Sequence, residues 1–99
     1  MKTSIATEIL KQLGANKFIA MTGVKHLADG RDYIQMQLAS NISKAKYLII
    51  RLTEKDLYTM EFSKFDKELN KKVVAFYDNV YADMLRKIYT SVTGQLTSL

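Results

Sequence analysis

Two short runs in which every second residue is apolar constrain the fold of this 99-residue chain most strongly. They occupy residues 33–38 and 46–52. Because successive side chains of a strand point to opposite faces, the alternation predicts two strands that each bury one face. The polar, turn-like sequence at residues 41–44 favours antiparallel pairing of the two. The apolar positions are Ile34, Met36, Leu38, Leu48, Ile50 and Leu52.

Three further segments have the composition of strands. Residues 17–24 are rich in apolar and β-branched side chains, and the connection after them ends in an Asp-Gly turn signal at residues 29–30. Residues 58–63 alternate again, and residues 72–77 form a last apolar run after a polar loop. Short connections between consecutive strands predict an antiparallel meander of about five strands.

Apolar residues at helical spacing predict a helix at each end of the sheet sequence. The first spans residues 4–13 and ends at Gly14. Candidate N-caps are Ser4 or Thr3 for the first helix and Asp78 or Asn79 for the second. The apolar stripe of the second helix is Tyr81, Met84, Leu85, Ile88, Tyr89 and Val92, closed by Gly94. The predicted fold class is α+β, with an antiparallel meander sheet flanked in sequence by an N-terminal and a C-terminal helix that pack on one face, in a single domain over residues 1–99.

The sequence offers no residue set typical of an active site. It has no cysteine and one histidine, His26, so neither a disulfide, a cysteine-based zinc site nor a pair of a histidine base and a nucleophile is indicated. His26 falls in the predicted connection after the first strand. The carboxylates lack the spacing of a calcium loop, and the four glycines are too scattered for a phosphate-binding loop. We therefore expect a protein that is not an enzyme and has no catalytic residues, metal ligands or cofactors.

The net charge of +5 and a pI near 9.5 favour an anionic partner. The alternative is that the lysines only keep a small domain in solution, because a net charge of this size is ordinary. The N-terminal residues lack the apolar run and cleavage site of a signal peptide, and no segment reaches transmembrane length. We expect a cytoplasmic protein without a membrane partner.

The face of the predicted sheet that the helices leave uncovered is the candidate binding site. Tyr33, Tyr47 and Arg51 fall on this face, and aromatic rings beside arginine can stack unpaired bases. Flanking lysines that would attract phosphates are Lys44, Lys46, Lys64, Lys71 and Lys72. Two alternatives stay open: the tyrosines only stabilise the sheet through cross-strand contacts, or the face is a homodimer interface centred on Ile49.

Segments at both ends of the chain carry a resemblance. They are residues 13–23, with the sequence LGANKFIAMTG, and the C-terminal stretch that includes VYADML at 80–85 and TGQLTSL at 93–99. They resemble a family of short, mostly uncharacterised proteins encoded by bacteriophages and integrated mobile elements. The similarity extends more loosely through the middle of the chain. The family brings no catalytic residues with it, so the resemblance implies none here.

The basic, aromatic-bearing face and the resemblance lead to one expected function. We expect a non-enzymatic accessory protein of a phage or mobile element that binds nucleic acid or a nucleoprotein, because small proteins of such elements commonly handle nucleic acid. The alternative is a protein-binding inhibitor of a host defence complex, of the anti-CRISPR type, which would contact its target through a few anchor residues.

Overall fold

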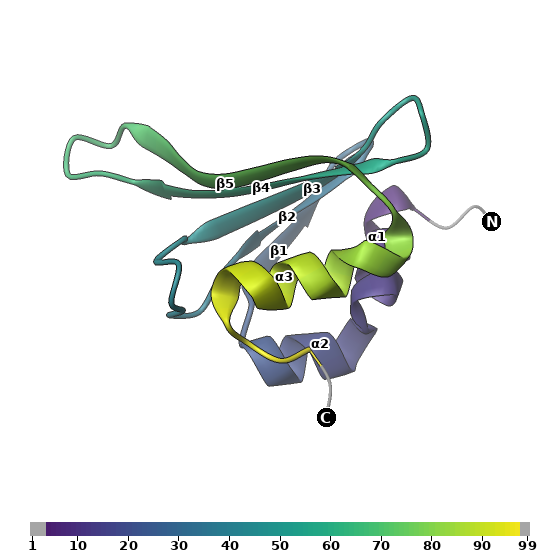
Figure 1. Ribbon diagram of the computed structural model, residues 1–99, viewed down its shortest axis with the longest axis horizontal. Coiled ribbons are helices and arrows are strands. Elements are labelled where there is room, and N and C mark those ends of the chain that lie inside the picture. Colours follow the sequence, from purple (N-terminus) through teal and green to yellow (C-terminus); the bar gives the residue numbers. More distant parts are fainter. Residues whose placement is uncertain (1–3, 98–99) are drawn as a thin grey trace.

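A computed structural model gives the fold and describes residues 4–97. The elements are α1 (Ile5–Leu13), α2 (Ala15–Thr22), β1 (Lys25–Asp29), β2 (Tyr33–Gln37), β3 (Tyr47–Leu52), β4 (Tyr58–Phe65), β5 (Lys71–Val80), the 3-10 helix η1 (Ala82–Met84) and α3 (Leu85–Thr93). In this part of the chain five strands form one antiparallel sheet in the order β1-β2-β3-β4-β5. The helices lie on one side of the sheet, α1 and α2 before it in sequence and α3 after it (Figure 1). The predicted α+β meander is confirmed.

The two alternating runs form the centre of the sheet. β2 pairs with β3 in the register that sets Ile34 opposite Ile50 and Met36 opposite Leu48. These four side chains are buried, whereas the residues between them are only partly covered. The alternation therefore predicted both strands and the face that each of them buries.

The first helix begins and ends where the sequence indicates. Ser4 is its N-cap, since Ser4 Oγ accepts a hydrogen bond from the Thr7 amide at 3.1 Å. Thr3, the other candidate cap, lies outside the described residues. Gly14 ends the helix with a φ of 121°, a conformation that favours glycine, and its amide donates back to carbonyls of the last turn.

The predicted strand over residues 17–24 is wrong, because this segment forms helix α2. The chain turns at Ala15, which has a left-handed φ of 53°, and enters the second helix at once. Phe18 and Thr22 are buried one helical turn apart, and Thr22 Oγ1 donates to the Phe18 carbonyl at 2.7 Å. Gly23 ends the helix at a φ of 71°. Burial of one helical face has overridden a composition that is typical of strands.

The first strand follows this helix, in the segment that was expected to be a connection. β1 pairs with β2, and its register is irregular between Lys25 and Ala28. His26, expected in a loop, lies in this irregular part of the strand with a left-handed φ of 53°. Every side chain of β1 is exposed. The apolar residues 17–22 belong to α2, so the outermost strand of the sheet is formed by the more polar residues 25–29 that follow.

The last strand is longer than predicted and changes the start of the C-terminal helix. β5 continues to Val80, so Asp78 and Asn79 belong to the strand and cap no helix. The short η1 then leads into α3, and Gly94 ends α3 with a left-handed φ of 76° as predicted. The predicted caps fail because pairing with β4 resumes at Val80, beyond both residues, which lie in an irregular part of the strand.

The predicted apolar stripe of the C-terminal helix is confirmed within α3 and fails before it. Leu85 and Tyr89 are fully buried, whereas Tyr81 and Met84 are exposed. Both exposed residues precede α3: Tyr81 has an extended backbone conformation, and Met84 is the last residue of the 3-10 helix η1. The spacing of 3.6 residues per turn does not apply there, so these side chains do not point at the sheet.

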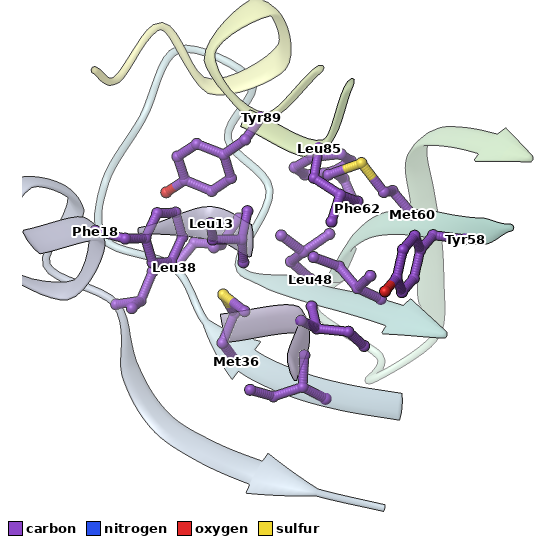
Figure 2. Packing of buried hydrophobic residues seen from close by; sticks show 14 of the residues in the cluster. Leu13, Phe18, Met36, Leu38, Leu48, Tyr58, Met60, Phe62, Leu85 and Tyr89 are labelled. Atoms are coloured by element: carbon purple, nitrogen blue, oxygen red, sulfur yellow. The ribbon is translucent and has the colours of Figure 1, made fainter. Parts of the chain in front are cut away.

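One apolar core lies between the sheet and the helices. Figure 2 shows Phe18 and Tyr89 next to each other, and their rings meet edge to face with centroids 5.0 Å apart at 71°. The buried residues of the core are Ala6, Ile9, Leu13, Phe18, Val24, Ile34, Met36, Leu38, Ala45, Leu48, Ile50, Tyr58, Met60, Phe62, Val80, Leu85 and Tyr89. All three helices and all strands except β1 contribute to this set, so the helices fix one face of the sheet and leave the other uncovered.

Tyr89 makes the stability of the fold sensitive to alkaline pH. Burial raises the pKa of Tyr89 above its ordinary value, and hydrogen bonding to the Thr22 and Thr93 side chains opposes part of this rise. The unfolded chain therefore ionises this tyrosine first. Its contribution to stability is complete below about pH 10 and is lost as pH rises through the higher pKa of the folded state.

We expect the stability of a Tyr89→Phe variant to fall less steeply than that of the wild type as pH rises above about 10, because the variant has no proton to lose at this site. Urea unfolding at a series of pH values measures the slope. Tyr81→Phe changes an exposed tyrosine and should follow the wild-type curve. Equal slopes for all three proteins would contradict the prediction.

Candidate nucleic-acid interface

The open face is the sheet surface opposite the helices, and no described helix or strand packs on it (Figure 1). It carries the residues that alternate with the buried positions of β2, β3 and β4, together with their cross-strand partners on β5. The open face comprises Tyr33, Gln35, Gln37, Tyr47, Ile49, Arg51, Thr59, Glu61, Ser63, Phe65, Lys71, Val73 and Phe76.

The β4–β5 hairpin extends beyond the helices (Figure 1). Asp66 closes its turn, since Asp66 Oδ1 accepts hydrogen bonds from the amides of Glu68 and Asn70 at 2.9 Å each. Leu69 completes the turn with a left-handed φ of 66°. The turn holds the end of β4 and the start of β5 side by side where no helix covers them.

Asn41 organises the connection between β2 and β3. Its side-chain amide donates to two carbonyls of this connection at 2.8 and 3.0 Å, and its Oδ1 accepts from the Ser43 amide at 3.0 Å. The connection presents Lys44 and Lys46, both exposed. The Lys46 amide donates to the Ser63 carbonyl at 2.8 Å, so these lysines lie beside the end of β4.

Lysines gather at the end of the sheet where β1, β3 and β5 begin and where β2 and β4 finish. This lysine end comprises Lys25, Lys44, Lys46, Lys64, Lys67, Lys71 and Lys72, with Asp66 and Glu68 in the hairpin turn. The opposite end carries Asp29, Asp32, Glu54, Asp56 and Asp78 with Arg31, Arg51 and Lys55. The positive charge is therefore concentrated at one end of the sheet, which favours the approach of an anion there.

Tyr33 and Arg51 lie at the opposite end from the lysines and contact each other. The Arg51 guanidinium lies over the Tyr33 ring, 4.8 Å from its centroid, and Arg51 Nη1 is 2.8 Å from Asp32 Oδ1. The Tyr33 ring also lies against Gly30, where an added Cβ would clash with the Tyr33 ring. A base would have to displace these contacts to stack here. The geometry thus favours the structural alternative for this pair.

Tyr47 lies at the lysine end beside a second aromatic residue. Its ring meets Phe65 edge on, with centroids 5.6 Å apart and an interplanar angle of 76°. Phe65 is 49% exposed, and Phe76 on the same face is 57% exposed. The Phe65 ring therefore offers apolar surface to solvent next to the lysines, and the Phe76 ring does so further along the same face, opposite Glu61.

The lysines at this end differ in their ion pairs. Lys71 Nζ is 3.0 Å from Glu61 Oε2, and Glu61 lies opposite Phe76. The lysine therefore neutralises the Glu61 carboxylate. Lys64 lies directly opposite Lys72 on the hairpin, and neither forms an ion pair with any residue of the range 4–97. Like charges opposite each other on neighbouring strands repel, so an anion bound between these lysines would remove the repulsion.

The structure separates the predicted site residues into two groups. At the lysine end, Tyr47 and Lys71 lie on the open face, and Lys44 and Lys46 lie in the adjacent connection. Lys64 and Lys72 lie at the same end but on the other face of the hairpin. Tyr33 and Arg51 lie at the opposite end of the sheet. Sequence reasoning missed Phe65 and Phe76. Extending the alternation of residues 58–63 by two positions would have found Phe65. No such signal marks Phe76, because the register of β4 and β5 shifts beyond Phe62 and moves it to the open face.

Residues 4–97 contain no group of three or more histidine, cysteine, aspartate or glutamate side chains that could hold a metal ion. None of the helices in this range combines the length and the apolar character that crossing a membrane requires.

Comparison of the chain with models of known families, with curated proteins and with solved structures finds no match in any of the three. The resemblance to proteins of phages and mobile elements therefore stays a prediction.

Proposed function

We propose that this chain is a non-enzymatic accessory protein of a phage or mobile element that binds single-stranded nucleic acid at the lysine end of its open face. The observation that supports this proposal is the exposed Phe65 ring, which lies on the open face at the end of the sheet where the lysines gather. Lys64 and Lys72 lie on the other face of the hairpin at this end, and within residues 4–97 neither has a carboxylate partner. The phage origin rests on the sequence resemblance, and the binding mode rests on the chemistry of the surface.

Single strands are bound by a combination of stacking and charge that this surface offers. Unpaired bases stack on aromatic rings whatever their sequence, and lysines neutralise the phosphates between them. Tyr47 is packed edge on against Phe65 and so supports the ring that is more exposed. Lysine side chains are long enough to reach the border of the open face from the strand ends. A duplex would not expose its bases to these rings, so single strands are preferred.

We expect a double variant, Phe65→Ala with Phe76→Ala, to bind a labelled single-stranded oligonucleotide more weakly by about 1–3 kcal/mol for each lost stack. Fluorescence anisotropy at low and physiological salt measures the affinity. A second double variant, Lys64→Ala with Lys72→Ala, should lower the slope of log affinity against log salt by about 0.7 for each phosphate contact removed.

Two control variants test whether loss of binding is specific to the open face and its lysine end or follows from losing any exposed ring or lysine. Tyr81→Ala removes an aromatic ring that is 59% exposed but lies outside the open face, and Lys87→Ala removes a lysine of α3. Both should bind like the wild type. The proposal fails if the wild type does not bind single strands even at low salt, or if Tyr81→Ala weakens binding as much as the phenylalanine variant does.

A protein-binding inhibitor of a host defence complex is the second candidate function. Exposed apolar side chains on and beside the β4–β5 hairpin favour it, because they offer anchors for a protein surface. These residues are Phe65, Leu69, Val73 and Phe76. Absence of nucleic-acid binding at low salt would put this candidate first.

A further inference from the structure

β5 is a long, free edge of the sheet. It spans ten residues, Lys71–Val80, and among the described strands it pairs only with β4. Natural edge strands are usually short, or are interrupted by charges or proline, because an exposed edge is a template for another strand. The stretch 73–77 holds neither a charge nor a proline, and Val73, Phe76 and Tyr77 are exposed. The stretch 75–77, between the two register shifts of β5, is therefore open to pairing with another chain.

The charges along β5 suit a second copy of the same strand. The strand begins with Lys71 and Lys72 and has Asp78 near its end. In antiparallel pairing of two copies, the lysines of each copy lie near Asp78 of the other, whereas parallel pairing would set lysine against lysine. A two-fold symmetric contact uses the same patch on both copies and needs this kind of self-complementarity. We propose that two copies of this chain pair antiparallel through β5 and join their sheets into one.

The exposed area of the chain is large enough for such a contact. The accessible surface is 6542 Å² for a mass of 11.3 kDa, whereas a compact monomer of this mass exposes about 5,700 Å². The chain therefore exposes more surface than a compact monomer of its mass. The β4–β5 hairpin, which projects beyond the helices in Figure 1, holds much of the exposed apolar surface.

Pairing centres on the regular part of β5. The register of β5 with β4 shifts near Val73 and again before Val80, so residues 75–77 form the regular stretch between the shifts. With residues 75–77 at the centre, Asp78 of one copy lies opposite Val74 of the other, two residues along the strand from Lys72, whose own cross-strand neighbour is Lys64. The repulsion between these two lysines is thereby reduced. A two-fold axis perpendicular to the sheet keeps both open faces on the same side.

Sedimentation velocity of the full chain without nucleic acid tests this pairing, so its result does not depend on the proposed function. We expect a monomer–dimer equilibrium in the micromolar range. Asp78→Lys should raise the dimer dissociation constant about tenfold, because it turns two symmetric attractions into repulsions. Combining Asp78→Lys with Lys72→Glu restores opposite charges and should return the constant to within about threefold of the wild type.

Asp29→Lys makes the same charge change on β1, the other edge of the sheet, and should leave the equilibrium unchanged. Hydrogen exchange gives an independent readout, since backbone amides of β5 should exchange more slowly as the protein concentration rises. A monomer at every concentration would overturn the proposal. So would a dimer that Ile49→Lys abolishes and Asp78→Lys leaves intact, because that result places the contact on the open face.

Discussion

Replacing Leu85 by alanine is expected to lower the free energy of unfolding by about 2–5 kcal/mol, a large fraction of the stability of a domain of this size. Leu85 is 0% exposed and lies in the same core as Leu48 of the central strand (Figure 2). Ile50 of that strand belongs to this core as well. It is the first residue of α3, so its side chain sets where this helix docks on the sheet. Truncation leaves a cavity because the surrounding strands are held by their hydrogen-bonded ladder and relax only in part.

Urea unfolding followed by circular dichroism measures this loss as a lower midpoint with an unchanged slope. The matched control is Met84→Ala, at the neighbouring residue, which is 39% exposed and precedes α3. Its expected effect is below about 1 kcal/mol. Equal losses for the two variants would show that α3 docks differently from the structure described above.

The strands whose faces differ in polarity were predictable from the sequence. In β2 and β3 every second residue is apolar, and the sheet does bury one face against helices and leave the other uncovered. The period of two in polarity therefore indicates which face of each strand is buried and which is exposed. The helix α1 was predictable for the same reason, since its cap at Ser4 and its end at Gly14 are local features.

Helix α2 was not predictable because its pattern fits two structures. Phe18 and Thr22 are four residues apart, so they share a face in a helix and also in a strand. Ala20 between them distinguishes the two, because a strand would bury it with Phe18 and a helix turns it away. Ala20 is exposed in the structure. Alanine is small enough to be buried or exposed, so the residue type at position 20 does not distinguish a helix from a strand.

The candidate site was predictable only where it depends on local alternation. Tyr47 and Arg51 fall on the open face as the pattern of β3 requires. Their different surroundings depend on residues far away in sequence: Asp32 engages Arg51, and Phe65 packs against Tyr47. Such partners are brought together by the order and register of the strands, which alternation alone does not specify.

The second large effect is expected at the segment where sequence and structure disagree. Replacing Phe18 by alanine should lower the free energy of unfolding by about 3–5 kcal/mol. Phe18 is fully buried, and its ring meets Tyr89 edge to face, so the variant loses both apolar burial and an aromatic pair. The contact joins α2 to α3, and its loss should loosen both helices from the sheet.

The control for Phe18→Ala is Ala20→Glu, two residues along the same helix. Glutamate is a good helix former, and Ala20 is exposed, so the expected change is within about 0.5 kcal/mol. If residues 17–24 were a strand, this variant would bury an unpaired carboxylate beside Phe18 and unfold the domain. Urea unfolding of both variants thus tests the packing of Phe18 and the helical conformation of α2 together.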